Sequence, residues 1–210
     1  MGLLSRRGFA GALGAGVVLA GVPALARPEG PIPVLRLSIA VALEGGVPVC
    51  EDAWIDAQVA AAERLFGPFG VHFRKAVQRP LAERFARLET RKDRDALDAE
   101  RVRGVVNVFL VRALRDVDDP RLYRMGVHWR NTRAPAHRYV IVTAEALPST
   151  LAHELGHYNG LAHSAVVNDL MSYQRNSEDV FVQPGQGATV AAFARLAFAS
   201  GELVPEPARP

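Results

Sequence analysis

Residues 153–163 read His-Glu-Leu-Gly-His-Tyr-Asn-Gly-Leu-Ala-His and constrain the fold more than any other segment of the chain. On a helix, His153 and His157 lie one turn apart on the same face. Gly160 can adopt the left-handed conformation that ends a helix, so the chain can turn back and bring His163 toward the first two imidazoles. Three neutral imidazoles that converge in this way can hold a zinc ion and leave a fourth coordination position open, which is typical of a catalytic site.

A second feature of this segment is Glu154, which directly follows the first histidine. Its carboxylate is placed to act as a general base toward water at the metal. From the composition, His-Glu-x-x-His arises by chance in roughly one chain of this kind in a hundred. The addition of Gly160 and His163 lowers that chance to roughly two in a hundred thousand. Ordinary core or surface histidines are therefore the weaker interpretation.

The whole segment resembles H-E-x-x-H-x-x-G-x-x-H, the signature of the metzincin zinc metallopeptidases, which is followed by a methionine-containing turn. Eight residues after His163, Met171 lies within Asp-Leu-Met-Ser-Tyr. The resemblance implies that Met171 forms an apolar floor beneath the three imidazoles, the Met-turn, and the alternative is an ordinary core methionine. It also implies a twisted mixed sheet, an active-site helix and a C-terminal helix near the site.

Two subfamily resemblances conflict. His163-Ser164 and the short run to Met171 are similar to the matrixins, whereas Met-Ser-Tyr is similar to the astacins and serralysins. In those groups the tyrosine binds zinc as a further ligand and swings away to stabilise the transition state, a role that would fall on Tyr173. A core or rim tyrosine is the alternative. The subfamily therefore stays open.

Matrixins also carry a second zinc and calcium ions in the loop before the active-site helix. Here His128 and His137 lie in the corresponding stretch, but the Gly-Gly-Asp and His-Phe-Asp patterns are absent. Asp116, Asp118 and Asp119 form an acidic cluster whose spacing is not that of a calcium loop. We expect solvated loop residues there rather than a structural metal site.

Cys50 is the single cysteine of the chain, so it cannot form an internal disulfide. It lies between a strand and a helix that both look like core, and no segment resembles a removable propeptide. A buried free thiol is therefore favoured over a cysteine that caps the zinc. His72 lies in a predicted strand and is interpreted as a packed or surface histidine.

Residues 1–26 have the layout of an export signal. Ser-Arg-Arg-Gly-Phe is followed by an apolar run and then by Ala-Leu-Ala, a small-x-small cleavage pattern. The arginine pair resembles a twin-arginine signal, which directs bacterial export of folded proteins. We expect cleavage before Arg27, with an uncleaved membrane anchor as the alternative. The predicted location is periplasmic or extracellular, with membrane contact only during export.

Residues 27–210 predict one α/β (α+β) domain, because strands and helices follow one another without a linker or a repeat. Hydrophobic residues make up 49% of the chain and charged residues 22%, as in ordinary globular proteins. In chain order the predicted elements are strand 34–43, helix 51–66, strand 71–77, a charged helix with a break over 81–103, a buried strand at 105–111, an edge strand at 126–129, strand 139–143, helix 148–159 and helix 187–199.

Together these features predict a zinc-dependent metalloendopeptidase that acts on protein or peptide substrates. The ligands would be His153, His157 and His163, with Glu154 as general base. A zinc-binding exported protein without turnover is the alternative. Without the two arginines of the signal, the chain carries 23 basic and 22 acidic side chains, which gives no electrostatic case for a nucleic-acid partner. We expect a monomer, and the sequence does not indicate cleavage specificity.

Overall fold

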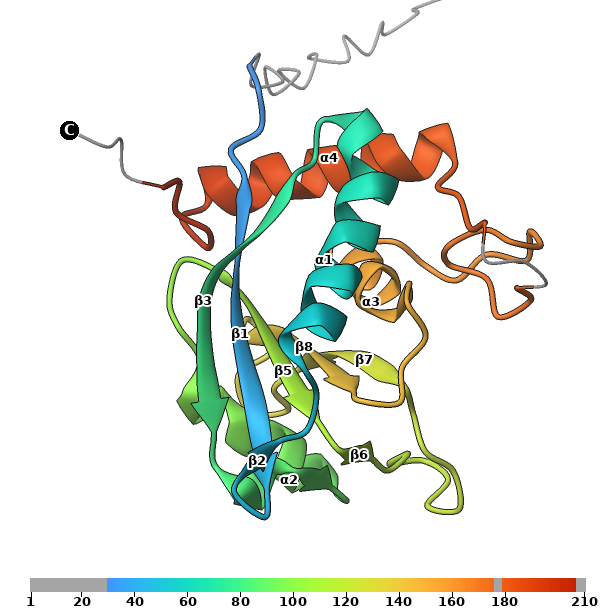
Figure 1. Cartoon of the computed structure of the whole chain (residues 1–210). Coiled ribbons are helices and arrows are strands. Elements are labelled where there is room, and N and C mark those ends of the chain that lie inside the picture. The colour runs from blue at the N-terminus through green and yellow to red at the C-terminus, as the bar shows by residue number, and fades with distance from the viewer. Residues whose placement is uncertain (1–29, 176–178, 207–210) are drawn as a thin grey trace, which may run out of the picture.

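A twisted mixed sheet of six strands forms the centre of the computed structural model, which describes residues 30–175 and 179–206 (Figure 1). The strands follow the order β2-β1-β5-β8-β7, and β3 pairs with β1. A separate two-stranded sheet pairs β4 with β6. The elements are β1 (Leu35–Glu44), β2 (Val47–Pro48), α1 (Asp52–Phe66), β3 (Phe73–Leu81), β4 (Arg87–Leu88), α2 (Arg91–Ala96), β5 (Val106–Val111), β6 (Ala113–Leu114), β7 (Gly126–Arg130), β8 (Arg138–Thr143), α3 (Thr150–Tyr158) and α4 (Pro184–Ala199).

Parallel pairing places β5 at the middle of the sheet. Strands β3, β1, β5 and β8 run parallel to one another, and β7 runs antiparallel to β8 at the edge. All six residues of β5 are buried, as expected for a parallel strand that is covered on both faces. The predicted buried strand and the predicted edge strand are therefore both confirmed, and so is the α/β class of the fold.

Helices α1 and α3 pack against each other, and α3 also contacts β7 and β8 (Figure 1). The buried amide of Gln58 links the two helices: its Nε2 donates to the Leu147 carbonyl at 2.8 Å, and its Oε1 accepts from the Leu151 backbone N–H at 3.0 Å. Ser149 at the N-cap of α3 makes no side-chain capping bond. Gln58 therefore satisfies a backbone N–H group that the first turn of a helix leaves unpaired.

The charged segment 81–103 differs most from prediction. A helix with a break was expected, but β3 continues to Leu81 and only α2, six residues long, is α-helical. Phe85, Leu88 and Leu97 are buried in the core, so the chain between them folds into short elements: a 3₁₀ turn at Glu83–Phe85, β4, α2 and a 3₁₀ turn at Leu97–Glu100. Pro80 lacks an N–H group and is tolerated because β3 pairs with β1 alone and is an edge strand. Thr90 and Asp93 form the capping box that starts α2.

The C-terminal helix α4 crosses the top of the molecule in Figure 1 and begins three residues before its predicted start at residue 187. Pro184 occupies the first turn, where its missing N–H has no intrahelical partner to lose. Gln183 and Gln186 bond each other's backbone N–H groups in a reciprocal cap. Pro184-Gly185 therefore opens the helix, although the pair is more typical of a break.

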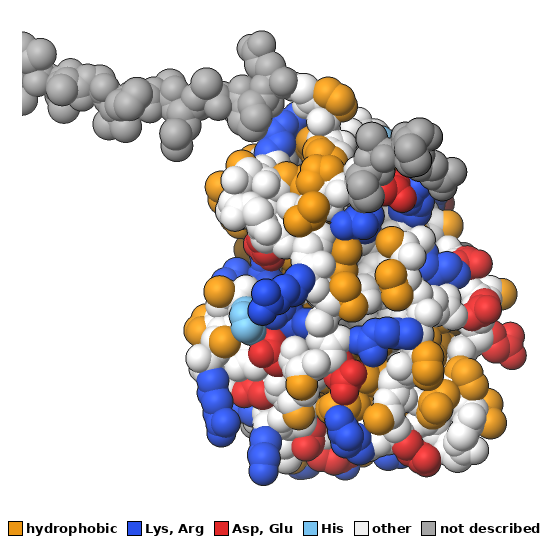
Figure 2. Space-filling view, turned by 90° about the vertical axis from the view of Figure 1, so that its left-hand side faces the viewer, with side chains coloured by type: hydrophobic (Ala, Val, Ile, Leu, Met, Phe, Trp, Pro, Cys, Tyr) orange, Lys and Arg blue, Asp and Glu red, His pale blue; other side chains and the backbone are white. Residues whose placement is uncertain are grey.

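Acidic and basic side chains are interspersed on the face that carries β3 (Figure 2). Among the described residues, none of the helices combines the length and the apolar character needed to cross a bilayer. The predicted signal segment 1–26 lies outside the described residues.

We predict that Glu202→Gln lowers stability at pH 7. Arg138 donates to the Glu202 carboxylate from Nε at 2.7 Å and from Nη2 at 2.9 Å, and the Tyr158 hydroxyl donates to it at 2.8 Å. Burial alone would raise the pKa of Glu202, but these hydrogen bonds and the Arg138 charge lower it overall. The stabilisation is therefore present above the ordinary pKa of 4.5 and is lost as the pH falls through the folded-state pKa.

Loss of this charge-assisted interaction costs about 2 kcal/mol, so urea unfolding at pH 7 should separate the variant from wild type by that amount. The gap should narrow as the pH falls from about 5 to about 3. Glu145→Gln, at a side chain that is 80% exposed, is the control and should change stability by less than about 0.5 kcal/mol. If the difference in free energy of unfolding between Glu202→Gln and wild type is the same at about pH 5 and about pH 3, the stabilisation does not come from the ionised carboxylate.

Candidate metal centre

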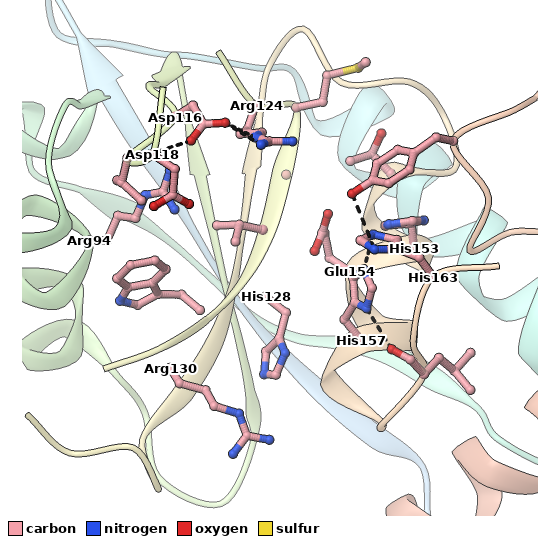
Figure 3. A pocket seen from close by; sticks show the side chains of 18 of the residues that line it. Arg94, Asp116, Asp118, Arg124, His128, Arg130, His153, Glu154, His157 and His163 are labelled. Carbon is pink, nitrogen blue, oxygen red and sulfur yellow. Dashed lines mark hydrogen bonds and ion pairs between the residues drawn. The ribbon is translucent and has the colours of Figure 1, made fainter. Parts of the chain in front are cut away.

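The three histidines predicted as ligands lie together at one wall of a cleft (Figure 3). His153 and His157 come from α3 and His163 from the loop that follows it, and one ring nitrogen of each lies within 4.8 Å of the others. Nε2 of His157 is 3.1 Å from Nε2 of His163. Two ring nitrogens at that distance share either a proton or a cation. The donor set therefore fits a metal ion that prefers nitrogen ligands.

Backbone carbonyls decide which nitrogens face the site. Nδ1–H of His153 donates to the Leu170 carbonyl at 2.7 Å, and Nδ1–H of His157 donates to the Leu161 carbonyl at 2.8 Å. Because a carbonyl only accepts, the proton stays on Nδ1 and the lone pair of Nε2 is left for a metal. Burial lowers the pKa of His153 to about 4 and lowers the pKa values of His157 and His163 as well. At neutral pH these imidazoles are uncharged, the form that binds metals.

The turn that brings His163 to the site depends on Gly160. This residue has φ +89°, and a Cβ there would lie 2.5 Å from the Phe193 ring of α4. The Leu161 N–H donates to the Gly156 carbonyl at 3.0 Å and closes the end of the helix. Gly160 therefore ends α3 as predicted, and the structure adds a second reason for glycine, which is the close approach of α4.

Met171 is fully buried and packs against α3. A Cβ on Gly156 would lie 2.6 Å from the Met171 sulfur, so this glycine leaves room for the methionine. Gly156 lies between His153 and His157 in the sequence of α3. The Met171 carbonyl also accepts from the Ser164 N–H at 3.0 Å. The chain after His163 thus returns against the helix at the position where the resemblance implied a Met-turn.

Asp169 positions this turn, and nothing in the sequence pattern marked it. Its carboxylate is fully buried and accepts from the Met171 N–H at 2.7 Å, from Gln183 Nε2 at 2.6 Å and from Gln186 Nε2 at 3.0 Å. These bonds tie the turn to the start of α4. Two of the three donors lie 14 and 17 residues away in the chain, so only the folded structure reveals the connection.

Glu154 points from α3 toward β7 (Figure 3) and is only 6% exposed. Burial raises its pKa to about 7, although the backbone N–H of His128 and the charges of Arg175 and Arg124 oppose the shift. Gly126 leaves space for this carboxyl, because a Cβ there would lie 2.8 Å from Glu154 Cγ. A carboxyl group with a pKa near neutrality can both accept and release a proton.

Tyr173 lies at the rim of the cleft, beside the third predicted ligand. Its ring centroid is 4.4 Å from that of His163, and its hydroxyl is 3.5 Å from His163 Nδ1. The side chain is 70% exposed, which excludes a core position. Its position leaves two of the alternatives open, a tyrosine at the rim of the cleft and a further group at the metal.

Arg175 also lines the cleft and had not been predicted as a site residue. Its Nε donates to the Ser172 carbonyl at 2.9 Å and its Nη1 to the Ser149 hydroxyl at 3.0 Å, while its Nη2 lies 3.4 Å from His153 Nδ1. It therefore brings a positive charge close to both Glu154 and the first histidine. The only sequence signal was its place four residues after Met171, and no motif distinguishes that place.

The acidic cluster before β7 is not the set of solvated residues that was expected. Asp116 is 3% exposed, accepts from the Asp118 N–H at 2.8 Å and pairs with Arg124. Asp119 pairs with the neighbouring Arg121. The expectation is wrong for Asp116 because turn N–H groups and an arginine replace water around its carboxylate.

Of the three other histidines, two each lie beside one carboxylate, and the ring of the third bonds none within the part of the chain that the structure describes. His137 lies 2.9 Å from Asp98 and His72 lies 2.5 Å from Glu63, while Nε2 of His128 is buried without a hydrogen-bond partner. Over residues 30–175 and 179–206, the three-histidine group is the one place where three or more potential ligands converge.

Cys50 lies apart from the metal cleft. It lines a separate cavity of about 500 Å³ next to β1 and β3, and it is partly buried. Burial raises the pKa of its thiol to about 11, which makes it a poor metal ligand at neutral pH. Its position gives no support to a cysteine that caps the metal.

The twisted mixed sheet, the helix that carries His153 and His157, the turn that contains Met171 and the C-terminal helix match the predicted fold class. No family model and no curated protein matches the chain. Among solved structures the chain is similar to metalloproteinase-II from Bacteroides fragilis, with a TM-score of 0.53 and 15% identity over 77% of this chain and 53% of that chain. The chain therefore spans about half the length of that protein.

Mirolysin is similar over its whole length. Mature mirolysin from Tannerella forsythia, in complex with a cleaved peptide, gives a TM-score of 0.58 with 12% identity over 85% of this chain and 100% of that chain. Mirolysin in complex with compound 9 gives 0.60 with 11% identity over 84% and 100%. At these identities the similarity shows a shared metalloproteinase fold.

We predict that Gly160→Ala destabilises the protein and weakens metal binding. The alanine Cβ would be strained at φ +89° and would collide with Phe193, which together cost about 1–3 kcal/mol. Thermal unfolding and a competitive zinc titration measure the two effects. Gly185→Ala is the control in α4, because no atom lies within 4 Å of its Cβ position, and it should unfold at or above the wild-type temperature. Equal unfolding temperatures for Gly160→Ala and wild type would refute the role of this turn.

Proposed function

We propose that this protein is a zinc-dependent metallopeptidase that cleaves internal peptide bonds, with zinc held by His153, His157 and His163. The observation that carries the proposal is the buried carboxyl group of Glu154 beside three neutral imidazoles in a cleft of about 820 Å³. A purely structural zinc site is closed by four protein ligands and needs no such carboxyl group. The metalloproteinase fold supports the same reading.

Zinc would supply a Lewis acid that polarises the scissile carbonyl and lowers the pKa of water. Glu154 takes a proton from the attacking water and passes it to the leaving amine nitrogen, as a C–O bond forms and the C–N bond breaks. The Tyr173 hydroxyl, which lies 3.5 Å from His163 Nδ1, would donate a hydrogen bond to the oxyanion. The carbonyls of Leu170 and Leu161 hold the imidazoles in orientation throughout.

The edge strand β7 supports an extended peptide as substrate. Within the described sheet it pairs with β8 alone, so its other edge can accept an added strand. Glu154 points toward this strand (Figure 3), and a peptide bound along β7 would therefore pass the three histidines. Mirolysin was solved with a cleaved peptide, which is consistent with such a substrate.

Export is part of the proposal and rests on residues 1–26 alone. We propose translocation by the twin-arginine route, which carries proteins that are already folded and could therefore export the protein with its zinc in place. N-terminal sequencing of the exported protein should begin at Arg27, and retention of the arginine pair would contradict removal of the signal.

We predict that Glu154→Gln abolishes peptidase activity and keeps the metal. Loss of a general base lowers kcat/KM by about 10²- to 10⁴-fold, while the three imidazoles remain available to zinc. Hydrolysis of casein or a quenched peptide measures activity, and atomic absorption measures zinc per chain. The exposed-site variant Glu145→Gln should match wild type in both assays.

Full activity in Glu154→Gln would contradict the proposed chemistry. Zinc-loaded wild-type protein that cleaves no peptide would instead favour the zinc-binding protein without turnover.

We predict that Tyr173→Phe lowers kcat with little change in KM. The variant removes one hydroxyl and leaves an exposed aromatic ring, so neither folding nor zinc content should change. Loss of an oxyanion hydrogen bond lowers the rate by about a hundredfold. A change confined to KM would assign Tyr173 to substrate binding alone.

A further inference from the structure

Arg94, in α2, is buried at the cleft and bonds no carboxylate among residues 30–175 and 179–206. It lines the cleft and is 3% exposed. Its Nη2 donates to the Arg115 carbonyl at 2.7 Å, and its guanidinium lies 4.8 Å from the Trp129 ring centroid. Nε is buried with no hydrogen-bond partner. A buried charge is normally paired, so this guanidinium group points to a missing anion.

The nearby carboxylates do not supply that anion. Asp116 accepts from Arg124 and from two turn N–H groups. Asp118 pairs with Arg91 at 2.5 Å, on a side chain that is 77% exposed. The Asp95 carboxylate accepts from Trp129 Nε1 at 2.8 Å and from the Thr132 N–H at 3.0 Å. Among the described residues, the carboxylates near Arg94 therefore bond other donors, and none of them bonds its guanidinium group. We call the region lined by Arg91, Arg94, Arg124 and Trp129 the arginine arm.

Arg94 lies across β7 from the histidines (Figure 3). Gly126 on β7 faces Glu154, and the His128 ring contacts Tyr158, so these even-numbered residues face α3. Trp129 faces the other way, toward Arg94. One continuous cleft therefore borders both sides of the strand, with the metal site on one side and the arginine arm on the other.

We propose that the arginine arm binds a carboxylate of the peptide substrate, from an Asp or Glu side chain or from the chain's C-terminus. This inference rests on the proposed function, because a peptide paired with the free edge of β7 presents successive side chains to alternate faces. One set faces the metal site and the other faces the arm. Trp129 offers an apolar surface to the methylene groups, and Arg94 donates to the carboxylate.

The charge of the arm selects the kind of anion. One unpaired guanidinium group near Asp116 and Asp118 suits a monoanion such as a carboxylate. A phosphate group, with its higher charge, would be repelled by these two acids.

A peptide scan tests the proposal. In a quenched fluorogenic peptide, each position in turn carries either Glu or Gln, so that every Glu peptide has a matched Gln peptide. Each peptide is made once with a free C-terminus and once with an amidated C-terminus. We expect kcat/KM to favour Glu over Gln by about ten- to a hundredfold at one position, or at two positions with one residue between them, because alternate side chains share a face. A preference confined to the free C-terminus would identify the terminal carboxylate as the ligand. Equal cleavage of all these peptides would overturn the proposal.

Two variants should change the ratio of kcat/KM for the Glu peptide to kcat/KM for the Gln peptide (the Glu/Gln ratio) in opposite directions. Arg94→Gln removes the free charge and should bring the ratio toward one. Asp118→Asn removes a competing carboxylate from an exposed position and should raise the ratio. Arg64→Gln, at an exposed position on α1 outside the cleft, should leave it unchanged. If Arg94→Gln fails to fold in a thermal melt, Asp118→Asn carries the test, and an unchanged or lower ratio in that variant counts against the arm.

A binding measurement separates this inference from the peptidase proposal. Fluorescence anisotropy with zinc-loaded Glu154→Gln protein compares the same Glu and Gln peptides without turnover, and the Glu peptide should bind about tenfold more tightly or better. Peptides that are cleaved but show no charge preference would overturn the arginine arm alone. Peptides that are bound with the preference but never cleaved by wild type would overturn the peptidase function alone.

Discussion

The left-handed turn at Gly160 is the constraint on which the rest of the site depends. Two histidines on one helix face can hold a metal only weakly, and the third reaches them because the chain reverses at this residue. Phe193 packs where a side chain on Gly160 would lie, so α4 holds the reversal in place. Asp169 joins the start of α4 to the turn that contains Met171. The helix, the loop and α4 therefore form one supported unit around the imidazoles.

Burial tunes both kinds of titratable group at the site in the useful direction. Removal from water disfavours charge, so it lowers the pKa of His153 to about 4 and raises the pKa of Glu154 to about 7. At neutral pH the imidazoles are kept uncharged, the form that can bind a metal, and the pKa of the carboxyl group is brought near the pH at which it can exchange protons. The same desolvation makes an unpaired Arg94 costly, which is why its position at the cleft indicates a ligand.

Motif spacing and apolar runs in the sequence predicted the features that depend on residues close together in the chain. The spacing of His153, His157 and His163 predicted their convergence, and the apolar run of β5 predicted a central strand. Charge density misled the prediction for 81–103, because the buried residues Phe85, Leu88 and Leu97 divide the charged run into short elements that only tertiary packing defines. Asp169 and Arg94 could not be found in this way, since their roles come from partners that only tertiary packing brings near.

X-ray absorption of the zinc-loaded protein reports directly on the proposed three-histidine centre. We predict nitrogen and oxygen ligands at about 2.0–2.1 Å with the multiple-scattering signature of three imidazoles. His163→Ala should reduce this signature to two imidazoles, while His72→Ala should leave three. A spectrum with sulfur in the first shell, or with the same imidazole signature in wild type and His163→Ala, would contradict a three-histidine centre completed by the turn at Gly160.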